Sequence, residues 1–146
     1  MAYAHVAHDN VIADDVVVAN AVQLAGHVVL GRYAVVGGCT AIHQFTRVGD
    51  HAFIGGASVV VMDVPPFCKA SGNRARLMGL NSVGLKRRGF GERHLRMLRR
   101  AYRLAFRSGL LLKDAVRRIR EEVVPECEPA CLFADFLESS TRGITR

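Results

Sequence analysis

The sequence predicts a mainly β protein with an α-helical carboxy-terminal part: a parallel β-helix, or solenoid of short strands, followed by a small helical bundle. Three observations lead to this prediction. Aliphatic residues recur at every sixth position from Val6 to Val60, consecutive prolines interrupt the pattern at Pro65, and helical spacing of apolar residues begins at Glu92. A chain of 146 residues, half of them hydrophobic, has room for two such unequal parts.

The six-residue repeat is the strongest internal pattern. Ten consecutive positions in steps of six are aliphatic: Val6, Ile12, Val18, Leu24, Leu30, Val36, Ile42, Val48, Ile54 and Val60. The next position is mostly alanine or glycine, and the fifth position of each hexad is compact. A helix repeats at about 3.6 residues and a simple strand at about 2, so this period fits neither. It fits a solenoid in which one aliphatic side chain per flat side points inward and small residues allow a tight corner.

Pro65 and Pro66 are expected to end the repeat, because proline cannot donate a backbone hydrogen bond to a further strand. The sequence therefore predicts a β-helix over residues 1–66, a connecting segment over 67–90 and a helical domain over 91–146. The first part has two basic and five acidic side chains, a net charge of −3. The rest has 18 basic and eight acidic ones, a net charge of +10, which recovers the +7 of the whole chain and should attract anions.

The repeat is already present at the first residues. Residues 1–5 look like another hexad and not like a cap. A solenoid needs a cap because its terminal coil otherwise exposes unpaired backbone edges and an open apolar core. We therefore expect the chain to be the carboxy-terminal portion of a longer β-helix, or to have a partner that covers the open end.

Three helices are expected after residue 91. The first begins at Glu92 and ends at Ser108–Gly109, the second spans 113–123 and the third 129–137. Arginines surround the apolar stripe of the first helix, which consists of Leu95, Leu98, Ala101, Tyr102 and Ala105. These arginines form either a solvated face or a surface for an acidic protein. No recognition-helix framework or aromatic stacking pattern supports nucleic-acid binding.

The cysteines and the hydropathy restrict the setting. Cys39, Cys68, Cys127 and Cys131 include no CxxC pair, and the chain has no signal-peptide pattern and no long apolar run. We expect a soluble protein in the reducing cytoplasm, without an integral membrane segment. No nearby histidine pair completes a zinc site with Cys127 and Cys131, so these thiols are expected to be inert.

The hexad pattern resembles that of the hexapeptide-repeat acyltransferases, which are left-handed parallel β-helices with a triangular section. Three hexads make one turn in those proteins, so residues 18 apart lie on adjacent coils, about 4.8 Å from each other. His8 then lies under Gly26 and Gln44, and Asp9 lies under His27. One outer ridge, about 10 Å long, is expected to consist of His8, Asp9, Gly26, His27, His43 and Gln44.

The ridge leaves two interpretations open, acid–base catalysis and a metal site. Imidazole clusters commonly bind zinc, and the γ-class carbonic anhydrases use the same fold with zinc at a subunit interface. His51 lies on a different edge of the predicted solenoid and is expected to be ordinary solvated surface.

Longer strings make the resemblance more specific. "AHVAHDN", "DVPPFCKASGN", "GLNSVGLKRRGF" and "STRGITR" are similar to the bacterial UDP-N-acetylglucosamine O-acyltransferase family, which begins lipid A synthesis. The resemblance covers essentially the whole chain in order. It implies a homotrimer with active sites between subunits, in which a 3-hydroxyacyl group moves from acyl carrier protein to the 3-hydroxyl of the sugar. No metal or other cofactor is implied, and an inactive fragment of such an enzyme remains an alternative.

The resemblance also implies catalytic residues. His8 matches the general base, Asp9 the carboxylate that holds it, and Gly26 the glycine whose backbone N–H stabilises the oxyanion. These roles are chemically reasonable. A sugar hydroxyl needs a base that titrates near neutral pH, a carboxylate fixes the tautomer of the imidazole, and an oxyanion needs a preorganised donor.

Binding residues are implied in the same way. The sugar and acyl chain would contact His5, His27, His43, Gln44 and Gly56. Gly56 matches a position associated with acyl-chain length, although glycine is also common at solenoid corners.

The UDP moiety is assigned to Asn81, Arg87 and Arg88, since guanidinium groups suit a pyrophosphate. Val83 and Arg74 replace a glutamate and a histidine of some relatives, which affects the details of recognition.

Overall fold

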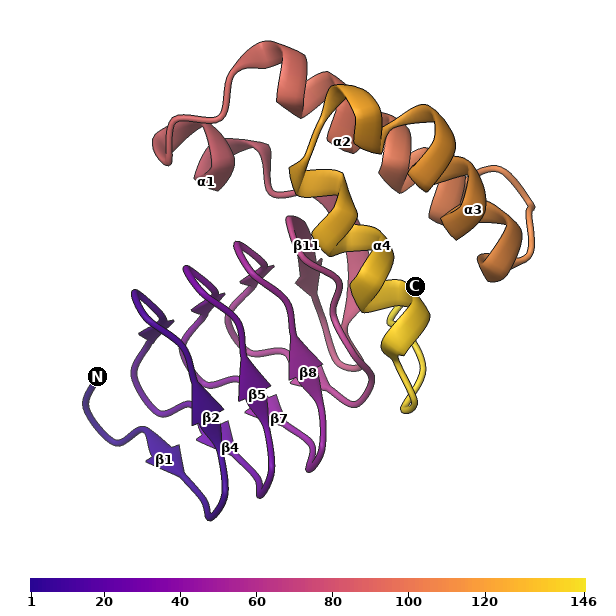
Figure 1. Ribbon diagram of the computed structural model, residues 1–146. Coiled ribbons are helices and arrows are strands. Elements are labelled where there is room, and N and C mark those ends of the chain that lie inside the picture. The colour runs from indigo at the N-terminus through magenta and orange to yellow at the C-terminus, as the bar shows by residue number, and fades with distance from the viewer.

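The protein is described by a computed structural model that covers all 146 residues and consists of a β-solenoid with helices at one end (Figure 1). Ten two-residue strands form its coils. They are β1 (His5–Val6), β2 (Val11–Ile12), β3 (Val17–Val18), β4 (Gln23–Leu24), β5 (Val29–Leu30), β6 (Val35–Val36), β7 (Ala41–Ile42), β8 (Arg47–Val48), β9 (Phe53–Ile54) and β10 (Val59–Val60).

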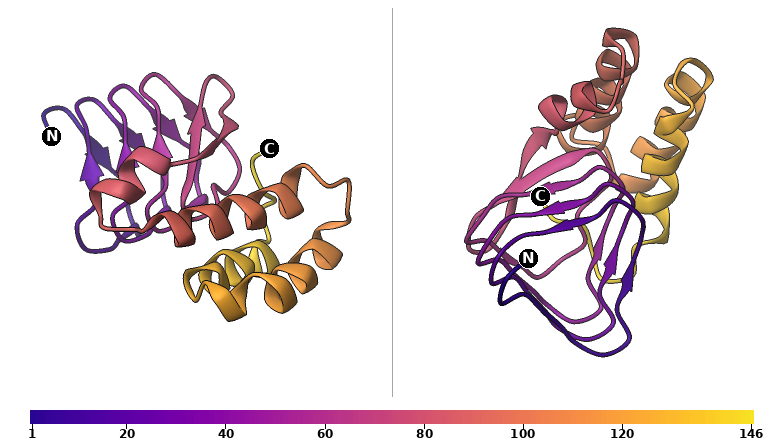
Figure 2. Two further views of the ribbon diagram at one scale, coloured as in Figure 1. Left: turned by 90° about the horizontal axis from the view of Figure 1, so that it is seen from above. Right: turned by 90° about the vertical axis from the view of Figure 1, so that its left-hand side faces the viewer.

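Each strand pairs in parallel with the strand three places later, so that three sheets form the three sides of the solenoid. The orders are β1-β4-β7-β10, β2-β5-β8 and β3-β6-β9. Seen along its axis, the solenoid has a triangular outline (Figure 2). His5 pairs with Gln23, and Gln23 pairs with Ala41. The step of 18 residues confirms that three hexads make one turn, and with it the predicted parallel β-helix.

The interior is filled from two positions of each hexad instead of one. The aliphatic positions from Leu24 to Val60 are at most 2% exposed. The fifth positions are equally buried, at 0%: Val22, Val28, Ala34, Thr40, Thr46, Ala52 and Ser58. These residues are compact and completely buried, since little space remains where two sides of the triangle meet. In the first coil, Val6 is 47% exposed and Ile12 41%, since no coil lies over them in the structure.

The corners turn at the third residue after each aliphatic position, which has a positive φ. At one corner these residues are Asp9, His27 and Phe45, with φ of 58°, 59° and 63°. A left-handed conformation costs a residue with a side chain about 1–2 kcal/mol. Hydrogen bonds between coils offset this cost: the N–H of His27 donates to the carbonyl of His8, and that of Phe45 to the carbonyl of Gly26, both at 3.1 Å.

The parallel ladder continues beyond the prolines. Strand β11 (Cys68–Ser71) pairs in parallel with β9 and in antiparallel with β12 (Arg76–Leu80). The hairpin therefore extends one side of the solenoid towards the helices, although the six-residue period ends at Val60. The proposed division at residues 66 and 90 stays a prediction.

The helices form a second hydrophobic core, centred on residues such as Leu98, Ile119 and Phe133. They are α1 (Ser82–Arg87), α2 (Glu92–Phe106), α3 (Leu112–Glu122) and α4 (Pro129–Ser139), with a 3-10 turn at Val124–Glu126. The three longer helices confirm the helical prediction to within one or two residues at their ends. No helix combines the length and the apolar character needed to cross a membrane.

After α4 the chain returns to the solenoid. Asp63 and Ile144 form a parallel bridge, in which the N–H of Asp63 donates to Gly143 and the N–H of Thr145 donates to Asp63. The carboxy-terminal segment thus lies against the last regular coil (Figure 1).

Candidate functional site

His8 and Asp9 follow β1 at the corner between the first two sides of the solenoid. Nδ1 of His8 lies 2.9 Å from Oδ2 of Asp9. Because an ionised carboxylate only accepts hydrogen bonds, Nδ1 carries the proton and Nε2 keeps its lone pair, which is the form that a general base requires. The hydrogen bond from His8, with a further contribution from His27, lowers the pKa of Asp9 below its usual value, so this carboxyl is ionised at neutral pH.

Gly26 lies one coil further along and touches the imidazole of His8. A Cβ at this position would be 2.7 Å from Cε1 and 2.8 Å from Nε2 of His8. Its φ is not in the left-handed region, so the glycine is required for space and not for its backbone conformation. Any larger residue would displace the ring of His8.

The backbone N–H of Gly26 has no acceptor in the structure. The equivalent N–H groups of Gly38 and Gly56 are also unpaired, so this is a property of the turn. Only at Gly26 does an imidazole lie beside the free donor. A lone pair and an unpaired N–H therefore occur together at one place on the surface.

His27 extends the site along the axis. Its Nε2 is 3.7 Å from Oδ2 of Asp9, and its ring centroid is 5.1 Å from that of His8, nearly perpendicular to it. Phe45 stacks on the other side of His27, at 4.6 Å and 11°. Phe45 was not predicted as a site residue. It could have been found from the sequence, because two steps of 18 residues lead from Asp9 through His27 to Phe45.

A metal ion could be held by His8, Asp9 and His27, because one ligand atom from each lies within 4.8 Å of the others. Three protein ligands and a water are the usual set of a catalytic zinc. However, a metal on Nδ1 of His8 would displace the proton and the 2.9 Å hydrogen bond to Asp9, and a metal on Nε2 would occupy the lone pair that a general base requires. These residues fit a metal only at the expense of the pair that fits a base.

The remaining predicted ridge residues lie as the winding predicts. Gln44 is on the coil after Gly26, and His43 precedes it, with its Nδ1 2.7 Å from a guanidinium nitrogen of Arg142. His5 lies in β1, next to Gln23, just before the same corner. The ridge runs over three successive coils.

Gly56 does not lie on this ridge. It follows β9 and belongs to the corner of Gly38, whose carbonyl oxygen is 3.2 Å from where a Cβ of Gly56 would be. Within one chain, the structure does not bring Gly56 together with His8.

Asn81, Arg87 and Arg88 line a pocket of about 740 Å³ at another corner, beneath α1. Oδ1 of Asn81 accepts from the N–H of Gly84 at 3.2 Å, which caps α1. Its Nδ2 donates to the carbonyl of His51 at 2.9 Å, which ties α1 to the solenoid. Three cations, those of Lys69 and the two arginines, make the pocket suitable for an anion.

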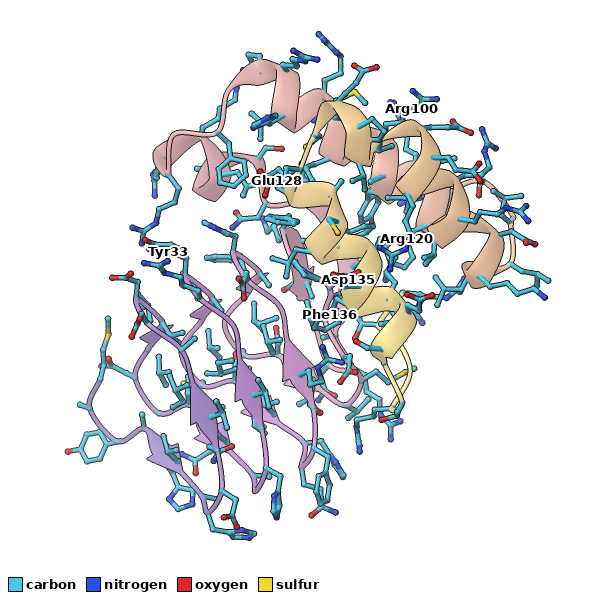
Figure 3. The ribbon with its side chains drawn as sticks, in the orientation of Figure 1. Tyr33, Arg100, Arg120, Glu128, Asp135 and Phe136 are labelled. Carbon is cyan, nitrogen blue, oxygen red and sulfur yellow. The ribbon has the colours of Figure 1, made fainter.

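Aromatic rings build the wall of this pocket. The guanidinium of Arg88 lies 4.3 Å from the ring centroid of Tyr33, and that of Arg32 lies 4.9 Å from it. Figure 3 shows Tyr33 at the tips of the coils, below α1. Tyr33 was not predicted as a site residue, because its contact with Arg88 joins the repeat to a segment more than 50 residues away.

His51 is not the solvated surface residue that was expected, and that prediction is wrong. It is half-buried and stacks between Tyr33, at 4.9 Å, and Phe67, at 5.8 Å. Burial lowers the pKa of His51. Asp50 opposes this shift, and the charges of Arg88 and Arg32 reinforce it.

The ridge and the pocket are separate in one chain. No ridge residue lines the 740 Å³ pocket, and the side chain of His8 is 72% exposed. Catalytic groups usually work where water is excluded. The ridge alone does not provide such an enclosure.

Comparisons with known proteins agree with one another. A family model described as UDP N-acetylglucosamine O-acyltransferase, domain 2, matches residues 63–145. The acyl-acyl-carrier-protein–UDP-N-acetylglucosamine O-acyltransferase of Myxococcus xanthus is 49% identical over 146 residues, which are all of this chain and 56% of that protein. The protein of the same name from Paraburkholderia phymatum is 46% identical, over all of this chain and 57% of its own length.

Solved structures show the same similarity. The structure of LpxA from Acinetobacter baumannii matches with a TM-score of 0.95 and 43% identity, over 98% of this chain and 55% of that one. The chain spans about half the length of the curated relatives it matches. The family model covers more than half of the chain, and the predicted resemblance is confirmed. The chain belongs to the UDP-N-acetylglucosamine O-acyltransferase family.

Proposed function

We propose that this chain provides the acid–base site of an acyltransferase. The enzyme would move a 3-hydroxyacyl group from acyl carrier protein to the 3-hydroxyl of UDP-N-acetylglucosamine in the cytoplasm, as the first step of lipid A synthesis. The names of the relatives support the carrier protein and the sugar nucleotide. The observation that carries the proposal is the contact of His8 with both the Asp9 carboxylate and Gly26.

In the proposed reaction, Nε2 of His8 takes the proton of the sugar hydroxyl as its oxygen attacks the thioester carbon. The carbonyl oxygen gains negative charge and accepts a hydrogen bond from the N–H of Gly26. Collapse of this intermediate breaks the carbon–sulfur bond, and the imidazolium returns its proton to the leaving thiolate. Asp9 stabilises the imidazolium and keeps Nδ1 protonated, and a positioned base of this kind contributes about a hundred- to ten-thousandfold in rate.

Substrate binding is proposed to involve more than one copy of the chain. Arg87 and Arg88 would bind the pyrophosphate, with Asn81 shaping the nucleotide pocket. In a homotrimer, the exposed ridge of one copy would face the pocket of another. This arrangement is supported by the separation of the two corners within one chain and by the 72% exposure of His8.

The other proposed contacts lie closer to the reacting groups. His5, His27, His43 and Gln44 would position the sugar and the acyl chain on the ridge. Gly56, which is at a different corner, would limit acyl-chain length from the neighbouring copy.

A transfer assay tests the proposal. Purified 3-hydroxyacyl carrier protein and UDP-N-acetylglucosamine are incubated with the chain, and the acylated sugar nucleotide is detected by mass spectrometry. A second arm uses a chimaera that adds the part of the Myxococcus xanthus relative that this chain does not match. Product in either arm is expected. Its absence from both would favour an inactive fragment and count against the proposal.

The metal-binding geometry of His8, Asp9 and His27 favours one alternative, a zinc-dependent hydratase. Under the proposed function, a chelator leaves acyl transfer unchanged and the chain does not hydrate carbon dioxide. Loss of transfer in the chelator, with recovery on addition of zinc, would contradict the metal-free mechanism.

A further inference from the structure

The carboxy-terminal segment is held against the solenoid by a buried carboxylate. Asp63 is 1% exposed, and both of its carboxylate oxygens accept hydrogen bonds. Oδ1 accepts from the N–H of Arg47 at 2.8 Å, and Oδ2 accepts from the hydroxyl of Ser140 at 2.7 Å. The backbone bridge at Gly143 and Thr145 fixes the same segment three to five residues further on. The register of residues 140–145 on the solenoid is therefore defined.

This register places Arg142 beside the ridge. Its Nε donates to the carbonyl of Val61 at 2.7 Å, which orients the guanidinium. A second nitrogen of the same guanidinium lies 2.7 Å from Nδ1 of His43, a residue 99 positions earlier in the chain. A guanidinium is always protonated and can only donate, so Nδ1 of His43 must be the acceptor.

The contact determines where the proton of His43 lies. If Nδ1 carried a proton, two donors would face each other at 2.7 Å. The carbonyl of Gln44, the other partner of Nδ1, is 3.3 Å away and cannot outweigh that repulsion. The proton therefore lies on Nε2, which leaves His43 as a hydrogen-bond donor to anything bound on the ridge.

His8 has the opposite arrangement. Its Nδ1 donates to the carboxylate of Asp9 and its Nε2 is an acceptor. We infer that Arg142 is a positioning residue, which fixes His43 as an Nε2–H donor while Asp9 fixes His8 as an Nε2 acceptor. The ridge then presents one imidazole that takes a proton and one that donates a hydrogen bond. The inference deepens the proposed function and rests on it for the occupant, a substrate oxygen such as that of the sugar or the acyl group.

Nuclear magnetic resonance tests the tautomers without any turnover. In protein labelled with ¹⁵N-histidine, long-range proton–nitrogen correlations show which ring nitrogen carries the proton, and His43→Gln identifies the signals of that residue. The wild-type chain is expected to have the proton of His43 on Nε2 and that of His8 on Nδ1. A proton on Nδ1 of His43 in the wild type would overturn the inference, whatever the transfer assay shows.

A variant tests whether Arg142 is the cause. In Arg142→Met the donor is lost, and the proton of His43 is expected to move towards Nδ1, where it can donate to the carbonyl of Gln44. Arg146→Met, in the same segment, is the matched control and should keep the wild-type tautomer. An unchanged tautomer in Arg142→Met would also overturn the inference. Protection of the Thr145 amide from hydrogen exchange reports whether the segment is still docked.

Kinetics separate this role from a failure of the proposed function. If transfer occurs, Arg142→Met is expected to lower kcat/KM about ten- to a hundredfold while Arg146→Met does not. If no transfer occurs, the proposed function fails, but the tautomers of His43 still test the effect of Arg142. Full activity in an Arg142→Met protein whose tautomer has changed would show that the donor is not used.

Discussion

The two functional corners of the solenoid are built in different ways. At the corner of His8, the proposed catalytic groups all come from the repeat itself, and successive coils add one residue each along the series Asp9, His27 and Phe45. At the corner of Tyr33, the repeat supplies the stacked rings of Tyr33 and His51, and the later segment adds Phe67 and Phe90. The first corner can form as soon as two coils stack. The second exists only after the helical part has docked.

This difference matches a difference in chemistry. The ridge has a carboxylate that is hydrogen-bonded to one imidazole and lies 3.7 Å from a second, which suits proton transfer. The pocket under α1 has cations and aromatic faces, which suit the binding of a phosphorylated ligand. Thus the repeat provides the proposed catalytic groups, and the elements added after it provide the cations proposed to bind the nucleotide.

Apart from removal of the base itself, the largest expected effect on the ridge is that of Gly26→Ala. The new Cβ would lie 2.7 Å from the imidazole of His8, so the ring must move away from the backbone donor. We expect kcat for acyl transfer to fall about a hundred- to a thousandfold, as for loss of an oxyanion donor. Gly38→Ala is the matched control, since it occupies the same turn position at a corner without an imidazole. Equal losses in the two variants would show that the turn matters, and not the contact with His8.

Asp9→Asn should have a smaller effect, about a hundredfold on kcat, which is the lower end of what a positioned base contributes, because His8 itself remains. The amide can present its N–H group to Nδ1 and so stabilise the wrong tautomer of His8. The lowered pKa of Asp9 means that its carboxyl stays ionised until the pH falls below its usual range of about 4, so the acidic limb of the pH–rate profile should not come from Asp9. Asp15→Asn, at the equivalent position of the next corner, is the control. An unchanged kcat in Asp9→Asn would show that the carboxylate is not needed for catalysis.

At the other corner, Tyr33→Ala is expected to weaken binding of UDP, measured by calorimetry, by roughly three- to thirtyfold. The loss corresponds to one cation–π contact, that of Arg88 with the ring. Tyr33→Phe keeps the ring face and should bind nearly as tightly as the wild type. If Tyr33→Phe lost as much affinity as Tyr33→Ala, the hydroxyl would be the important group. Turnover at saturating nucleotide should change little in either variant.

The smallest effect concerns the pH dependence of stability. The folded state lowers the pKa of His51 because it is half-buried, so near pH 6 the unfolded chain binds more protons at this residue than the folded chain. The contribution of His51 to the free energy of unfolding is fully present above about pH 6.5, the usual pKa of histidine. This contribution is lost as the pH falls below that value towards the lowered pKa of the folded state. Both His51→Phe and His51→Gln should therefore show a smaller decrease of Tm between about pH 7.5 and pH 5.5 than the wild type. An unchanged slope in both variants would contradict the burial effect.

The ridge could be predicted from the sequence because, in this solenoid, residues 18 apart in the chain lie on adjacent coils. Once the step of 18 residues is adopted, the positions of Asp9, His27 and Gly26 follow, and the register confirms them. The same rule could not reveal which side chains turn inward at the fifth position, or that the corner residues have positive φ. Both features depend on the backbone dihedral angles of the coil. The spacing of hydrophobic residues along the chain contains no information about these angles.

The contacts of His51 and His43 could not be predicted for a different reason. His51 is buried by rings that come from outside the repeat, and His43 meets Arg142 across 99 residues. No periodicity links these segments. Their contacts depend on how the helices and the carboxy-terminal segment dock on the solenoid, which is a tertiary property.

The most direct test of the account is the turnover of His8→Ala in the acyl-transfer assay, measured in whichever of the chain and the chimaera is active. His94→Gln, which changes an imidazole in α2 away from the ridge, is the control. The account predicts a loss of about a hundred- to ten-thousandfold in kcat for His8→Ala, with unchanged affinity for UDP and normal turnover in the control. Full turnover of His8→Ala would contradict the claim that the coils gather the catalytic base on this ridge.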